Sequence, residues 1–112
     1  MTDFEAREEV LLTRQRVRIA SSNPGAYEGA MADFVAGWLR DNTPAEVLRE
    51  PVHPGRDNVV ARLRGASREH DLTYICHMDT MPVGEGWDFP PLAGEIVDGR
   101  LYGRGSCDMK AG

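Results

Sequence analysis

Apolar residues recur along this chain with two different periods, and the period changes where the secondary structure is expected to change. The clearest helical repeat begins at Tyr27 and ends at Leu39. Its apolar members are spaced by three or four residues: Tyr27, Ala30, Met31, Phe34, Val35, Trp38 and Leu39. This spacing predicts a helix with one face packed on a sheet, ended by the segment Asp41-Asn42-Thr43-Pro44.

A first helix is predicted over residues 3–19. Its acidic residues come early and its arginines late, which is the order that complements the helix dipole. Its apolar stripe is loose, because Phe4, Val10, Leu11 and Val17 match the helical period only in part. The polar cluster at residues 21–25 then predicts a turn before the second helix.

The segments after the second helix predict strands. Residues 45–50 favour an edge strand, and residues 51–57 a loop. Residues 58–64 alternate between apolar and polar side chains, which is typical of a half-buried strand. Residues 65–70 favour a turn. The continuous apolar run at residues 72–76 predicts a buried central strand.

Short apolar pieces lie among the glycines and prolines of residues 83–112. They predict mainly loop, with one hairpin from Glu95 to Tyr102 that turns at Asp98-Gly99. Two helices followed by strands predict the α/β class, with helices packed on a mixed β-sheet.

Composition narrows the possible functions. A chain of 112 residues has room for one small domain at most. Its net charge of −5 argues against nucleic-acid binding, which favours basic surfaces. It has no apolar run of about 18 residues and no apolar signal core, so we expect a cytoplasmic protein with no membrane partner. Its two cysteines are then expected to be reduced thiols.

The first candidate chemistry lies where the apolar run of residues 72–76 stops. His77 follows it directly and Asp79 comes two positions later. On an extended backbone these two side chains point to the same side. A neutral imidazole is the commonest metal ligand in proteins, and a carboxylate on its other nitrogen fixes its tautomer. The alternative is a hydrogen-bonded pair that only closes the strand.

The second candidate is the Gly-rich segment 103–112, which contains Asp108 and Lys110. It fits neither the P-loop pattern nor the G-x-G-x-x-G dinucleotide pattern. Glycines would let the backbone turn so that Asp108 points into a site, and one carboxylate can bridge two cations. A solvated surface loop is the alternative.

Other residues invite simpler interpretations. Cys76 is expected to point away from His77 into the core, and Cys107 to be a small buried residue. His53 and His70 are expected to be exposed in turns. Trp87 is expected to pack its loop against the body of the protein.

Taken together, these segments resemble the amino-terminal part of the di-zinc amidohydrolases and metallopeptidases. This is the family of aminoacylase-1, acetylornithine deacetylase, succinyl-diaminopimelate desuccinylase and glutamate carboxypeptidase. Its first motif, H-x-D-x-x-P, is matched by His77, Asp79 and Pro82. Its second, G-R-G-x-x-D-x-K-x-G, is matched by the segment from Gly103 to Gly112. The order and separation of the motifs agree too. The segment Ser21-Ser22-Asn23-Pro24, after the first helix, also resembles the family's usual start, so the likeness spans nearly the whole chain.

The resemblance implies a zinc-dependent hydrolase of amide or peptide bonds. His77 and Asp108 would be metal ligands, with Asp108 bridging two zinc ions, and Asp79 would be the catalytic residue that steadies His77. Co²⁺ or Mn²⁺ could take the place of Zn²⁺. The implied substrate is an N-acyl amino acid or a short peptide, and the full-length enzyme is expected to be a cytoplasmic homodimer.

The matching enzymes are several times longer than this chain. In them a glutamate general base, the remaining metal ligands and a dimerising lid domain lie downstream of the two motifs. We therefore expect residues 1–112 to be the N-terminal, incomplete part of the catalytic domain, inactive alone. The alternative is a catalytically silent fragment or a small anion-binding module that uses the loop 103–112.

Overall fold

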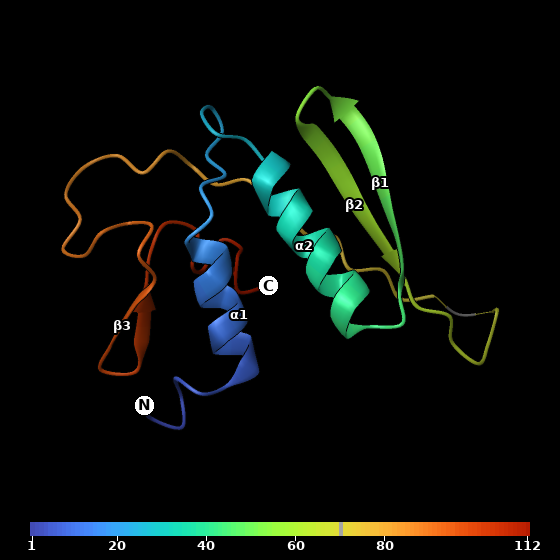
Figure 1. The fold of residues 1–112 in the computed structure, drawn as a ribbon, viewed down its shortest axis with the longest axis horizontal. Helices are drawn as coiled ribbons and strands as arrows, with labels where there is room; N and C mark the ends of the chain where they lie inside the picture. Colours follow the sequence, from blue (N-terminus) through green and yellow to red (C-terminus); the bar gives the residue numbers. More distant parts are fainter. Residues whose placement is uncertain (70) are drawn as a thin grey trace.

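The computed structural model describes residues 1–69 and 71–112, and His70, expected to be exposed in a turn, lies outside them. The described residues form α1 (Glu8–Val17), α2 (Gly29–Asn42), β1 (Glu46–His53), β2 (Arg56–Arg62), β3 (Glu95–Val97) and β4 (Arg100–Tyr102). The strands make two antiparallel pairs, β1–β2 and β3–β4 (Figure 1). The expected α/β class is confirmed. Within the described ranges, no helix is long and apolar enough to cross a membrane.

Helix α2 packs on the β1–β2 hairpin, as its apolar repeat predicted (Figure 1). Its buried residues are Met31, Ala32 and Ala36. The buried face is therefore rotated from the predicted one, because Ala30 is exposed and the two buried alanines were not in the predicted stripe. The periodicity of large apolar residues does not reveal such small buried positions.

Helix α1 is shorter than the predicted range of residues 3–19. Residues 3–6 form turns, and no side chain caps the helix at Arg7. Val10 and Val17 are buried, whereas Leu11 is 39% exposed. The loose apolar stripe thus has only two buried residues on α1, enough to hold ten residues in helical form but not the whole predicted range.

The loop predicted at residues 51–57 is wrong, because most of it belongs to strands. β1 continues to His53 and β2 already begins at Arg56, with Pro51 opposite Asp57 in the register. Gly55, at φ +73°, makes the turn. Pro51 is tolerated because a two-stranded ribbon has only edge strands, where a missing N–H can face away from the partner.

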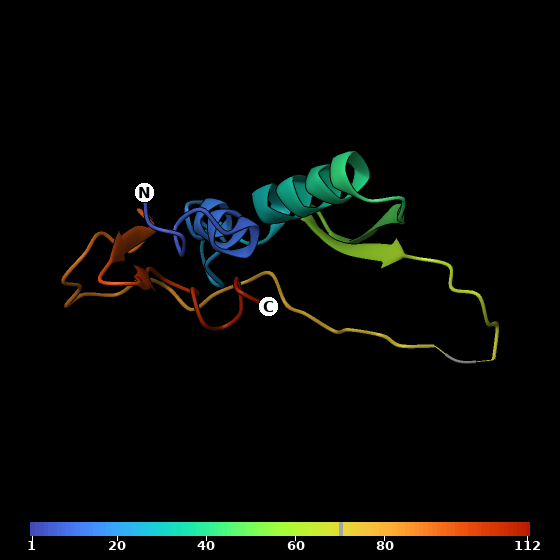
Figure 2. The same ribbon diagram turned by 90° about the horizontal axis from the view of Figure 1, so that it is seen from below.

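The central strand predicted at residues 72–76 is also not formed. This segment pairs with no strand of the described chain, and Leu72, Tyr74 and Ile75 are 78–92% exposed. In Figure 2 the chain from residue 71 onward runs below α2 as a long extended segment. An apolar, β-branched run favours extended backbone, but burial also requires neighbouring strands.

The second hairpin is confirmed. β3 and β4 pair with Ile96 opposite Leu101, and the turn residues Asp98 and Gly99 have φ values of +50° and +71°. Two consecutive positive φ values are typical of the type I′ turn that Asp-Gly favours. This hairpin lies on the side of α1 away from α2 (Figure 1).

An ion pair ties the start of α2 to the β1–β2 hairpin and makes stability depend on pH. Both Glu28 carboxylate oxygens accept hydrogen bonds from Arg56, at 2.6 and 2.7 Å. These bonds hold the pKa of Glu28 below its ordinary value of 4.5. The stabilisation is therefore complete above about pH 4.5 and is lost as the pH falls through the lower pKa of the folded state.

We expect Glu28→Gln to lower the free energy of unfolding at pH 7, and the difference from wild type to vanish in acid. Chemical denaturation at pH values from about 3 to about 7, the range in which carboxylates titrate, measures this difference in the free energy of unfolding. Glu50→Gln, on an exposed residue of β1, is the control. A difference in unfolding free energy between Glu28→Gln and wild type that stays constant down to the lowest pH would contradict the role given to the Glu28–Arg56 ion pair.

Candidate functional site

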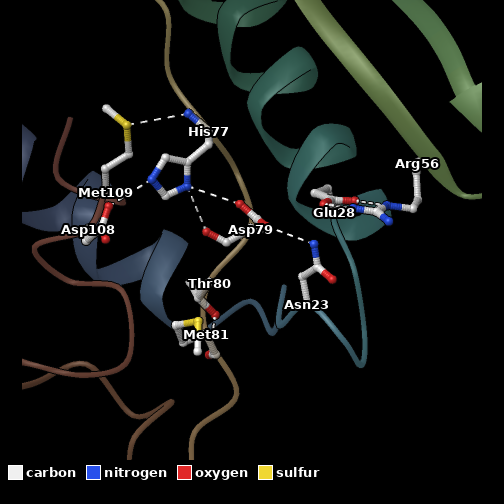
Figure 3. Close-up of polar contacts among 9 residues, drawn as sticks. All are labelled: Asn23, Glu28, Arg56, His77, Asp79, Thr80, Met81, Asp108 and Met109. Carbon is white, nitrogen blue, oxygen red and sulfur yellow. Dashed lines mark hydrogen bonds and ion pairs between the residues drawn. The ribbon is translucent and has the colours of Figure 1, made fainter.

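His77 and Asp79 lie side by side, as the H-x-D spacing predicted. The Nδ1 atom of His77 is 3.1 Å from Oδ1 of Asp79 and 3.0 Å from the Asp79 backbone oxygen (Figure 3). The segment is held by a parallel bridge between Ser22 and Thr80. Residues 77–80 are therefore held in place although residues 72–76 form no central strand. An acceptor at Nδ1 favours the tautomer that leaves the Nε2 lone pair free.

The Gly-rich loop brings Asp108 to the other nitrogen of the same imidazole. Nε2 of His77 is 2.8 Å from Oδ1 of Asp108 (Figure 3). The backbone N–H of His77 also donates to the sulfur of Met109, at 3.4 Å. Two segments about thirty residues apart in sequence thus meet at one side chain. The three residues that the motifs singled out are brought together.

Lys110 anchors this loop to the rest of the chain. Lys110 is 2% exposed, and its ammonium group donates to the backbone oxygen of Ile19 at 2.7 Å. Burial, with a smaller effect of Arg16, lowers the pKa of Lys110 to about 8. The ammonium is directed into the protein, whereas Asp108 is 88% exposed. The loop therefore presents a carboxylate rather than a cation, which favours a metal site over an anion cradle.

The carboxylates around His77 change its proton affinity. The hydrogen bond to Asp108, and then the contacts with Asp79, raise the pKa of His77 above its ordinary value of 6.5, while partial burial opposes the shift. A histidine between two carboxylates can share a proton with them or present its lone pair to a cation. A metal ion at Nε2 would compete with that proton.

The donor chemistry fits part of a metal site. Imidazole nitrogen and carboxylate oxygen are both zinc ligands, and the Nδ1 partner is the support that such a histidine needs. Among residues 1–69 and 71–112, however, no group of three or more His, Cys, Asp or Glu side chains is placed to hold one ion. A catalytic zinc takes three protein ligands. The chemistry of His77 and Asp108 therefore fits two donors of a larger set.

The remaining candidates behave differently from one another. Cys76 and Cys107 are both exposed, so the prediction that they are buried is wrong. Cys76 is exposed because the segment before it pairs with no strand of the described chain, so no buried core forms there. His53 is exposed, as predicted, but it ends strand β1 instead of lying in a turn. Trp87 donates to the Val83 oxygen at 2.6 Å and supports the Arg104 guanidinium 4.9 Å from its ring, which agrees with a packing role.

Sequence reasoning missed two residues of this cluster. Asn23 donates to Oδ2 of Asp79 at 3.1 Å, and Met109 accepts from His77. Asn23 stood out only as part of a polar turn and of the segment that resembles the family's start, and neither gave it a role at the site. Met109 gave no signal beyond its place in the motif. Both contacts depend on how distant segments meet, which no local pattern encodes.

Comparison with known proteins decides the family. The model of peptidase family M20/M25/M40 matches residues 74–112, the segment that contains His77, Asp79 and Asp108. A succinyl-diaminopimelate desuccinylase of Methylobacterium radiotolerans is 43% identical over 105 residues, which are 90% of this chain and 26% of that protein. The chain belongs to peptidase family M20/M25/M40.

Other members of this peptidase family match over a similar range. A succinyl-diaminopimelate desuccinylase of Rhodospirillum centenum is 35% identical over 96% of this chain and 28% of its own length. One of Sulfurimonas denitrificans is 35% identical over 84% of this chain and 24% of its own length. The chain thus spans about a quarter of the length of the curated relatives it matches.

Proposed function

We propose that this chain is the amino-terminal part of the catalytic domain of a metal-dependent amide hydrolase. His77 and Asp108 are its metal ligands, and Asp79 is the catalytic carboxylate that supports His77. The observation that carries the proposal is the imidazole of His77 held between the two carboxylates, 2.8 Å from Asp108 and 3.1 Å from Asp79. Asp79 orients the imidazole through Nδ1. A metal ion bound at Nε2, beside Asp108, would replace the proton that Nε2 can carry.

The substrate we propose is an N-acyl amino acid cleaved at its amide bond. The three relatives are desuccinylases of succinyl-diaminopimelate, which supports this class and the N-succinyl amino acids within it. We further propose a cytoplasmic homodimer as the complete protein. Residues 1–112 alone are inactive on this proposal, because two donors do not complete a zinc site.

The chain's own residues prepare the site. Asp79 accepts the Nδ1 proton of His77, which fixes the tautomer and raises the basicity of Nε2. The exposed carboxylate of Asp108 lies on the same side as Nε2 and supplies negative charge there. A bound divalent cation provides Lewis-acid polarisation of the amide carbonyl and lowers the pKa of a bound water. Zn²⁺ suits this nitrogen and oxygen donor set, and Co²⁺ or Mn²⁺ are alternatives.

The test is hydrolysis of N-succinyl-diaminopimelate by the complete protein that contains this segment. We expect succinate release that is abolished by a chelator and restored by adding Zn²⁺ or Co²⁺. N-acetyl amino acids and dipeptides distinguish the acyl preference. Release that continues unchanged in a metal-free preparation would contradict the proposal.

Asp79→Asn is expected to weaken both metal binding and turnover. The amide keeps the size of the side chain, but it removes the negative charge that steadies the His77 imidazole. Loss of such a support typically costs roughly 10–100-fold in metal affinity or activity. Competition with a chromophoric chelator and steady-state kinetics of the complete protein measure the two effects. Asp88→Asn, in the loop that contains Trp87, is the control, and equal losses in both variants would refute the role of Asp79.

A further inference from the structure

Asp79 uses its two carboxylate oxygens for two different partners. Oδ1 faces Nδ1 of His77 at 3.1 Å, and Oδ2 accepts a hydrogen bond from the side-chain amide of Asn23 at 3.1 Å (Figure 3). Because an ionised carboxylate only accepts hydrogen bonds, Asn23 must present its NH₂ group here. Contacts at both oxygens restrict the rotation of the carboxylate about its last torsion, which is otherwise broad.

The backbone of Asn23 is itself held against the segment that carries Asp79. Its N–H donates to the Thr80 oxygen at 2.9 Å, and the Thr80 N–H donates to the Ser21 oxygen at 3.0 Å. These two bonds form the parallel bridge between residues 22 and 80. Asn23 and Asp79 thus each lie next to a residue of the same bridge. The hydrogen bonds of the main chain therefore fix where the Asn23 side chain begins relative to Asp79.

Arg56, a cation whose charge interacts with that of Asp79, is bound to other partners. The Arg56 guanidinium makes two hydrogen bonds to Glu28 and stacks 4.3 Å from the ring of Tyr27. Figure 3 shows this pair on the far side of Asn23 from His77. The group that meets Oδ2 is therefore a neutral donor. It orients the carboxylate without neutralising the charge that Asp79 directs at the imidazole.

We infer that Asn23 is a positioning residue for the proposed metal site, which acts by fixing the carboxylate of Asp79 so that Oδ1 stays directed at Nδ1 of His77. The inference rests on the proposed function. The amide does not touch the imidazole or Asp108, so its effect passes through Asp79. The turn at residues 21–25, to which the sequence assigned no role at the site, then becomes part of it.

The test compares Asn23→Asp and Asn23→Ala with wild type in the complete protein. Asn23→Asp keeps the shape but removes the donor and sets a second negative charge against Asp79. We expect about 10-fold weaker zinc affinity in chelator competition, at the lower end of what supporting residues contribute. We expect kcat to fall by a similar factor while KM changes little. Asn42→Ala, which removes an amide bonded to the Trp38 oxygen on α2, is the control.

A double-mutant cycle separates positioning from a general effect on folding. In an Asp79→Asn background, adding Asn23→Ala is expected to cause no further loss of zinc affinity, because the carboxylate it orients is gone. Independent losses that multiply would overturn the inference. So would an Asn23→Asp variant that keeps zinc affinity and kcat within about twofold of wild type, the scatter usual for distant sites.

The two proposals fail in different ways. A wild-type protein that binds zinc through His77 but hydrolyses none of the N-acyl substrates would contradict the proposed function. The comparison of zinc affinities would still decide the role of Asn23. Conversely, an active wild-type enzyme with unaffected Asn23 variants would overturn the inference and leave the function standing.

Discussion

His77→Ala is expected to cause the largest loss of activity of any single substitution in this chain. The variant removes the nitrogen that lies 2.8 Å from Asp108 and leaves both carboxylates without their common partner. The two negatively charged carboxylates then face each other across the space that the imidazole filled. The loss should exceed the roughly 10–100-fold expected for a supporting residue, because a proposed ligand is lost outright.

Turnover of an N-succinyl amino acid and zinc affinity of the complete protein are the two measurements. The matched control is His53→Ala, because His53 is exposed at the end of β1. If His77→Ala keeps wild-type turnover, the metal assignment is wrong. If it loses turnover but keeps zinc affinity, His77 takes part in the reaction without being a ligand.

Gly105→Ala is expected to cause a large loss of stability. A Cβ atom at this position would lie 2.5 Å from Cγ2 of Thr80, which real contacts do not permit. The backbone at Gly105 also has a φ of +78°, which an alanine adopts at a cost of about 1–2 kcal/mol. Overpacking adds about 1–3 kcal/mol, so we expect a total loss of about 2–5 kcal/mol.

The position explains why this glycine also matters for the site. Thr80 follows Asp79 directly, and the Lys110 N–H donates to the Gly105 oxygen at 2.8 Å. Moving Gly105 away from Thr80 therefore moves the loop that holds Asp108 away from His77. We expect Gly105→Ala to lose zinc affinity as well as stability.

Gly99→Ala separates the two contributions. Gly99 has a similar φ of +71°, but a Cβ there would meet no atom within 4 Å. Its variant should lose only the backbone cost of about 1–2 kcal/mol and keep its zinc affinity. Chemical denaturation of the two variants under the same conditions makes the comparison. Equal losses would show that the contact with Thr80 is unimportant.

Local patterns were most informative where the structure is local. The Asp98-Gly99 turn predicted the β3–β4 hairpin because both of its residues adopt positive φ values without distant help. The apolar repeat from Tyr27 predicted α2, although its buried face also includes Ala32 and Ala36. The H-x-D spacing placed His77 beside Asp79 because alternate side chains of an extended backbone share one side.

The sequence was least informative where several segments must meet. The apolar run before His77 predicts a buried strand, but Tyr74 and Ile75 are exposed because the described chain supplies no strand beside them. The loop predicted at residues 51–57 became paired strand because β2 offered hydrogen-bond partners up to its first residue. Strand pairing depends on two segments, so the sequence of one segment does not show whether a partner strand lies beside it.

The sequence by itself determined the helices, the hairpin turn and the identity of the three candidate site residues, because each depends on neighbours within a few positions. Only the tertiary structure decided that Asp108 reaches the free nitrogen of His77, that Lys110 is buried against Ile19 and that Asn23 holds Asp79. These contacts join residues between 31 and 91 positions apart. Their formation requires the intervening chain to fold back on itself, and no local periodicity specifies where it returns.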